Sequence, residues 1–192
     1  CRFFGIRGML LTALALYLPL DYFIRAAASK GYLPAFTASI WDECLMLAAV
    51  AYILWHTAMR RAPVQGRATP LDGYLFLFIG VAFFLMCAVS PIPKIALDGW
   101  RAVVQYLFWF LLVIRLLEDD RDFGIFYGAL LTMAIVVALH GVYQFIVATP
   151  IPAAWVSQTE QGVRTRVFSI TGSPNIMGSL LVLFAPMAAG LA

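Results

Sequence analysis

Residues 162–178 read GVRTRVFSITGSPNIMG and separate two long apolar segments of the chain. Ser173 is a favourable N-cap and Pro174 suits the first helical position, so this stretch predicts that a helix begins here. The N–H groups at a helix N-terminus lack intrahelical partners and suit an anion. Arg164 and Arg166 precede that start by ten and eight residues, and guanidinium groups bind phosphate or diphosphate in a bidentate way. The alternative interpretation is an ordinary loop whose arginines meet lipid headgroups.

The composition is that of an integral membrane protein. Hydrophobic residues make up 63% of the 192 residues, charged residues 12%, and the mean hydropathy is +0.90. Several apolar runs approach the roughly 20 residues that a helix needs to span a bilayer, and none shows the alternation of a strand. A net charge of +3 without a basic block argues against nucleic acid as a partner. Scattered cysteines, two histidines and the absence of nucleotide or zinc motifs predict no cofactor and no metal site.

The order of apolar segments predicts an all-α, polytopic bundle that forms a single domain over residues 1–192. Pro19 is expected to kink the first span, and residues 25–39 are expected to form an interfacial connector. Because the chain starts at Cys1 and stops within an apolar run, we expect it to be the N-terminal part of a larger protein. About six spans are expected, at residues 3–24, 41–59, 71–89, 102–117, 123–147 and 174–192.

Polar residues near the ends of the expected spans are further candidates for a site. His140 and Gln144 lie four residues apart on one face of the fifth span, where they could line a headgroup pocket. Arg101 is expected at the outer end of the fourth span, where it either contacts the same ligand or reaches the membrane interface. Asp42 and Glu43 open the second span, and we expect them to form structural ion pairs rather than to orient an acceptor sugar.

From residue 141 onwards, the motifs resemble those of the O-antigen ligase/polymerase-like membrane family. The sequences GVYQ at residues 141–144 and PAAW at residues 152–155 are similar to segments of members related to teichuronic-acid biosynthesis proteins. RVFS at residues 166–169 then precedes GSPN at residues 172–175 and an apolar helix that contains Pro186. The resemblance places Arg166 in the position of the family's arginine before Gly-x-Pro-Asn.

This resemblance implies a multi-pass glycosyltransferase of the bacterial inner membrane with a cytoplasmic N-terminus. Such proteins transfer a glycan from undecaprenyl pyrophosphate to the hydroxyl of a glycan or lipid acceptor at the outer face. Arg166, with Arg164 and Arg101, would stabilise the diphosphate, and Asn175 would belong to the same site. The catalytic base is unknown and is expected downstream, so this fragment alone is expected to be inactive. Ligase and polymerase activities both stay open.

Two other functional classes stay open. A secondary transporter or flippase of lipid-linked glycans would use Arg166 and His140 along a translocation path. Transporters tend to place broken helices and polar sites at mid-membrane, whereas the charges here lie at the ends of the expected spans. A membrane scaffold without chemistry would tolerate both Arg166→Lys and Pro174→Ala.

Overall fold

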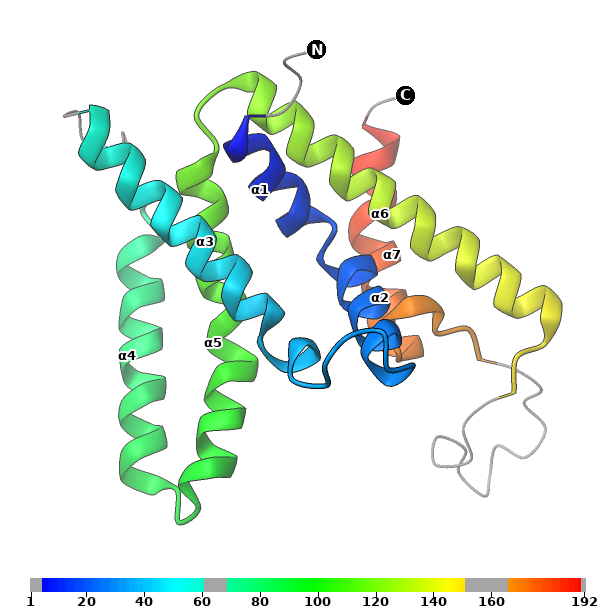
Figure 1. The fold of residues 1–192 in the computed structure, drawn as a ribbon, viewed down its shortest axis with the longest axis horizontal. Coiled ribbons are helices and arrows are strands. Elements are labelled where there is room, and N and C mark those ends of the chain that lie inside the picture. Colours follow the sequence, from blue (N-terminus) through cyan, green and yellow to red (C-terminus); the bar gives the residue numbers. More distant parts are fainter. Residues whose placement is uncertain (1–4, 61–68, 151–165, 191–192) are drawn as a thin grey trace. The chain divides into compact units, whose positions relative to one another are not determined.

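The structure is a computed structural model that describes residues 5–60, 69–150 and 166–190 (Figure 1). These residues form helices and turns and contain no strand, which confirms the predicted all-α fold class for the described part of the chain. The elements are α1 (Ile6–Ala15), α2 (Tyr17–Ser29), α3 (Thr37–Arg60), α4 (Asp72–Val89), α5 (Pro93–Leu116), α6 (Asp120–Val147), the 3-10 helix η3 (Ser169–Thr171) and α7 (Pro174–Ala189).

Four helices, α3 to α6, are long and apolar enough to cross a membrane. The bent pair of α1 and α2 would add a fifth span if the two helices cross the bilayer as one. Helix α7 is apolar but has only 16 residues, fewer than the roughly 20 that span a bilayer. The described residues therefore give four or five candidate spans, where hydropathy alone suggested six.

The first apolar segment is divided into two helices by a break about one turn before Pro19. Helix α1 ends at Ala15, and α2 resumes at Tyr17 after the single non-helical residue Leu16. A proline lacks the N–H that would bond the carbonyl four residues earlier, and its ring clashes with that carbonyl, which here belongs to Ala15. The expected kink is therefore present at Leu16. Helix α2 then continues to Ser29, so the connector is shorter than expected and comprises residues 30–36.

Helix α5 is one continuous helix from Pro93 to Leu116, so it begins well before the span expected at residues 102–117. Pro93 occupies a first-turn position of α5 after Ile92, whose backbone is extended (φ −123°, ψ 96°). A proline is favourable there because the N–H it lacks would have no intrahelical partner. Arg101 consequently lies within α5, two turns after the helix begins, and not at the start of a separate span.

The chain divides into two compact units. Unit 1 comprises Cys1–Leu14 and Asp42–Phe123, and unit 2 comprises Ala15–Trp41 and Gly124–Ala192. All three passages between the units lie inside helices, namely α1, α3 and α6. The single domain expected over residues 1–192 stays a prediction.

Ionic contacts hold together helices of unit 1. Helices α4 and α5 form an antiparallel pair joined by a turn at residues 90–92 (Figure 1). At the start of α4, the buried carboxylate of Asp72 accepts a hydrogen bond from Nη2 of Arg115 on α5 at 3.1 Å and another from Thr69 Oγ1 at 2.7 Å. Arg115 is in turn fixed by a 3.0 Å bond from Nη1 to the carbonyl of Leu111.

Ion pairs and hydrogen bonds fix several residues of the acidic run at residues 118–122. Arg7 of α1 forms ion pairs with Glu118 and with Asp122, whose Oδ2 lies 3.0 Å from Arg7 Nη2. Asp122 is buried, with 4% of its surface exposed. Asp119 Oδ1 accepts the backbone N–H of Asp122 at 2.8 Å, which caps the N-terminus of α6.

The core of unit 2 lies between α6 and α7. Met133 and Val137 of α6 pack with Met177 and Phe184 of α7. A Cβ at Gly141 would overlap the terminal methyl of Met177, so this flexible side chain would have to shift to admit one. This packing fixes the start of α7 against the second half of α6, and residues 166–178 lead into and begin that helix.

Candidate functional site

Arg166 and the first turn of α7 line one pocket. The pocket has a volume of about 330 Å³, and its lining residues are Arg166, Gly172, Ser173, Pro174 and Asn175. The predicted start of a helix at Pro174 is confirmed. Gly172 has a positive φ of 68°, and Ser173 is extended (φ −150°, ψ 130°), so the chain reverses at the glycine before α7 begins. The reversal places the arginine and the helix start, eight residues apart in the sequence, at the same cavity.

The start of α7 offers hydrogen-bond donors. Ser173 occupies the N-cap position, but its side chain makes no capping bond, which differs from the usual role of an N-cap serine. Pro174 has no N–H, and within the described residues the N–H groups of Asn175 and Ile176 donate to no acceptor. These donors add to the partial positive charge at the helix N-terminus. Together with the Arg166 guanidinium, they give the pocket the chemistry of an anion site.

Gln144 holds the chain between Arg166 and α7. Its Oε1 accepts the N–H groups of Ser169 at 2.7 Å and Phe168 at 3.1 Å, and its Nε2 donates to the Ser169 carbonyl at 3.4 Å. Gln144 and Ser169 are both buried. Ser169 has a φ of 50°, a left-handed conformation that costs a non-glycine residue about 1–3 kcal/mol and persists only where the surroundings hold it. The three hydrogen bonds of Gln144 stabilise this conformation of Ser169.

His140 contacts the same serine from one turn earlier on α6. Its Nδ1 lies 3.2 Å from Ser169 Oγ, which donates its own hydrogen to the carbonyl of Val137 at 2.7 Å. Because the hydroxyl hydrogen is used, Nδ1 has to be the donor to Ser169, and this assignment follows from the network. The rings of Tyr22 and Tyr143 lie beside the imidazole, with centroids 6.3 and 6.1 Å away. His140 is therefore a member of a structural network beside the pocket.

The structure brings together some of the predicted site residues. Arg166 and Asn175 line the pocket, whereas His140 and Gln144 bind the backbone that connects Arg166 to α7. Arg101 belongs to unit 1 and forms an ion pair with Glu43. Arg164 lies outside the described residues. No group of histidine, cysteine, aspartate and glutamate side chains suited to a metal ion occurs in the part of the chain that the structure describes.

Ser169 is the site residue that sequence reasoning missed. A serine between a phenylalanine and an isoleucine carries no signal for a left-handed conformation, and its contacts come from residues 25 and 32 positions earlier. The available signal was indirect. The polar residues His140 and Gln144 within an apolar helix require buried partners, and a nearby polar turn could supply them.

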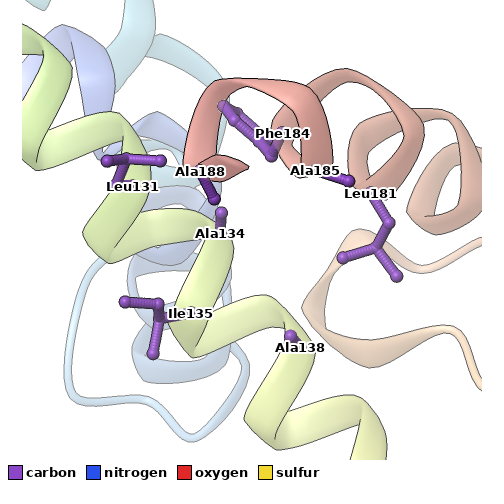
Figure 2. Close-up of a pocket in the computed structure, with 8 residues that line it drawn as sticks. All are labelled: Leu131, Ala134, Ile135, Ala138, Leu181, Phe184, Ala185 and Ala188. Carbon is purple, nitrogen blue, oxygen red and sulfur yellow. The ribbon is translucent and has the colours of Figure 1, made fainter. Parts of the chain in front are cut away.

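An apolar groove follows the later turns of α7 (Figure 2). Its volume is about 330 Å³. The small side chains of alanines on α6 and α7 leave room for the groove, and larger apolar side chains form its walls (Figure 2). The lining residues are Leu131, Ala134, Ile135 and Ala138 of α6 and Leu181, Phe184, Ala185 and Ala188 of α7. At 1.5 Å per residue, the groove begins about 10 Å and ends about 21 Å along α7 from Pro174. Helix α7 thus carries an anion-suited pocket at its start and an apolar groove further along.

Comparison of the chain with protein-family models, curated proteins and solved structures gave no match.

Proposed function

We propose that the chain contributes the donor site of a membrane glycosyltransferase. In this proposal, a glycan is transferred from undecaprenyl pyrophosphate to an acceptor hydroxyl at the outer face of a bacterial inner membrane, and the N-terminus is cytoplasmic. The observation that carries the proposal is the pocket shared by Arg166 and the first turn of α7. It combines a permanent cation with the positive end of a helix, which is what a diphosphate leaving group requires.

The chemistry assigns a clear task to this pocket. The bond between the anomeric carbon of the glycan and the diphosphate oxygen breaks, and the acceptor oxygen forms the new bond to that carbon. The hydroxyl proton passes to a base, while negative charge develops on the departing diphosphate. Arg166 and the N–H groups of Asn175 and Ile176 would stabilise that charge. Gln144 and His140 act as positioning residues, because they fix the turn that connects Arg166 to α7.

The groove along α7 supports a lipid-linked donor over a soluble one. A ligand whose anionic group binds at Pro174 would have its apolar tail directed along the bilayer, where Leu181, Phe184 and Ala188 line the groove (Figure 2). Burial of apolar surface would then add affinity that inorganic diphosphate lacks. A polyprenyl diphosphate has both parts.

A transporter or flippase of lipid-linked glycans is the second candidate, and one observation favours it. Helices α1 and α2 form a bent pair with a break at Leu16, and broken helices are common in transporters. The two functions predict accumulation of the lipid-linked glycan on opposite faces of the membrane, which makes them separable in one experiment.

The test uses Arg166→Ala and Arg166→Lys in cells that lack the wild-type gene. Lysine keeps the charge and removes the bidentate geometry. We expect both variants to lose surface polymer by about tenfold or more, since a hydrogen bond to a charged group contributes about 1.5–3 kcal/mol. Lipid-linked glycan should accumulate on the outer face. Arg25→Lys is the matched control, because Arg25 makes an exposed pair with Asp21 one turn earlier on α2.

Three outcomes separate the hypotheses at equal protein levels in the membrane. Loss of polymer with glycan on the outer face supports the transferase. Loss of polymer with glycan confined to the inner face favours the flippase. Normal polymer in both Arg166 variants removes the arginine from the mechanism and contradicts the donor-site proposal.

A further inference from the structure

The connector between α2 and α3 exposes three large side chains. It comprises residues 30–36, which read KGYLPAF, and we call it the aromatic loop. Tyr32 is 79% exposed, Phe36 62% and Leu33 37%. Exposed apolar side chains that gather on one short segment mark a surface for a membrane or for another protein. The proposed function assigns no role to this loop.

Contacts between α2 and the start of α3 close the aromatic loop. The indole Nε1 of Trp41 on α3 donates to Asp21 Oδ1 on α2 at 3.0 Å. The ring of Trp41 also stacks on that of Tyr17, with centroids 5.1 Å apart and an interplanar angle of 18°. Thr37 Oγ1 donates to the carbonyl of Pro34 at 2.7 Å. The exposed side chains of the loop take no part in these contacts.

The backbone donors in the first part of the aromatic loop have partners within the chain. The N–H groups of residues 30–33 donate to carbonyls in the last turn of α2 at 2.9 to 3.4 Å, and Pro34 has no N–H. In a bilayer, each backbone polar group without a partner costs several kcal/mol. Residues 30–34 avoid this cost for their N–H groups, which suits a loop that enters lipid.

The position and the charge of the aromatic loop favour lipid over a protein partner. Phe36 directly precedes α3, which is long and apolar enough to cross a membrane. The ends of spans lie at the membrane interface, where aromatic side chains gather. Residues 22–41 contain Arg25 and Lys30 but no carboxylate, and Arg25 pairs with Asp21. The Lys30 ammonium group therefore suits the phosphate of a phospholipid.

We propose that the aromatic loop is a membrane anchor. Its three exposed apolar side chains, Tyr32, Leu33 and Phe36, enter the boundary between phospholipid headgroups and acyl chains, where burial of their surface contributes affinity. Lys30 lies further out, at the level of the lipid phosphates. The anchor does not depend on the donor site.

An anchored loop would also fix the end of α2. This helix contacts η3, and its Tyr22 lies beside His140. Lipid bound at the aromatic loop would thereby hold α2 against the turn that carries Ser169.

The depth of spin labels tests the anchor in vesicles of phosphatidylethanolamine and phosphatidylglycerol. With the native cysteines replaced, Tyr32→Cys and Phe36→Cys each carry a nitroxide and keep the other aromatic side chain. Oxygen concentrates among acyl chains and a nickel chelate stays in water, so relaxation by the two agents reports the depth of the label. Lys30→Cys is the matched control within the loop.

Two exposed positions outside the loop provide the references for depth. Val81→Cys, near the middle of α4, represents the acyl chains, and Asp120→Cys, at the start of α6, represents water. We expect the labels at Tyr32 and Phe36 to give values between the two references, with a shift towards oxygen relative to Asp120. The label at Lys30 should lie closer to the water reference, and circular dichroism checks that each variant keeps its helices.

Two results would overturn the anchor. If the label at Tyr32 or Phe36 matches the water reference, the loop does not enter lipid, and a protein partner becomes the occupant of this surface. If the labels at Tyr32, Phe36 and Lys30 all match the Val81 reference, the loop lies among the acyl chains and Lys30 does not reach the phosphates.

Discussion

A single buried amide determines the geometry between Arg166 and α7. Gln144 makes three hydrogen bonds to the backbone of Phe168 and Ser169. The left-handed Ser169 therefore depends on a residue 25 positions away. A side chain that fixes the backbone affects a pocket that it does not line.

Gln144→Leu keeps the approximate size of the side chain and removes all three bonds. We expect it to destabilise the turn by about 1–3 kcal/mol, because two buried N–H groups lose their acceptor. Hydrogen–deuterium exchange should rise at the amides of Phe168 and Ser169 and stay unchanged in the first half of α6. Val142→Ala, at an exposed position of α6, is the control. Equal protection in both variants would show that Gln144 does not hold the turn.

At the scale of elements, Gly172 separates η3 from α7. Its φ is 68° and a Cβ would meet no atom within 4 Å, so a substitution costs backbone strain and causes no clash. Gly172→Ala should destabilise the turn by about 1–2 kcal/mol. Gly172→Asn should cost less, because asparagine adopts the left-handed region more readily. Thermal unfolding in detergent measures the difference. Alanine and asparagine variants of equal stability would contradict a role for the left-handed conformation.

The sequence predicted the elements better than their ends. Hydropathy placed α3, α4 and α6 to within a few residues, because a span needs a long apolar run whatever it packs against. The N-cap serine and the proline placed the start of α7. The kink expected from Pro19 lies at Leu16, because proline acts on the carbonyl one turn earlier. Helix α5 begins at Pro93, since Lys94, Asp98 and Arg101 all fit within a helix whose first turns need not be apolar.

The candidate site was predictable only in part, for a similar reason. Arg166 and Asn175 line one pocket. The position of Arg166 before the helix start suggested its place there, whereas Asn175 was expected only from the resemblance. The expectation that His140 and Gln144 line a headgroup pocket depended on tertiary contacts across 24 to 29 residues, which local patterns do not contain. In the structure these residues bind the turn.

At the scale of the whole molecule, the number of crossings is open to a direct test by cysteine labelling. With the native cysteines replaced, single cysteines are introduced at the exposed positions Gly5, Lys30, Lys94 and Asp120. A membrane-impermeant maleimide is then applied to intact and permeabilised cells. If the N-terminus is cytoplasmic and α1 and α2 cross as one span, Lys94→Cys should react in intact cells and Asp120→Cys only after permeabilisation, because α5 crosses between them.

The same labelling decides between four spans and five. Gly5→Cys and Lys30→Cys should react on opposite sides if α1 and α2 cross as one bent span, and on the same side if the pair re-enters. Reaction of Lys94→Cys and Asp120→Cys on one side would contradict the assignment of α5 as a span, and with it the arrangement of unit 1.

The ion pair at the start of α4 has a consequence for how that helix sits in lipid. Apart from Asp72, α4 carries no charged side chain and is apolar around its whole circumference. Contact with lipid tails therefore does not fix the rotation of α4 about its own axis, because every rotation presents a similar apolar surface to the bilayer. The bond from Arg115 to Asp72 selects one of these rotations, much as a single polar residue selects the register of a coiled coil. One carboxylate thus decides which of the phenylalanines of α4 meet α5 and which meet lipid.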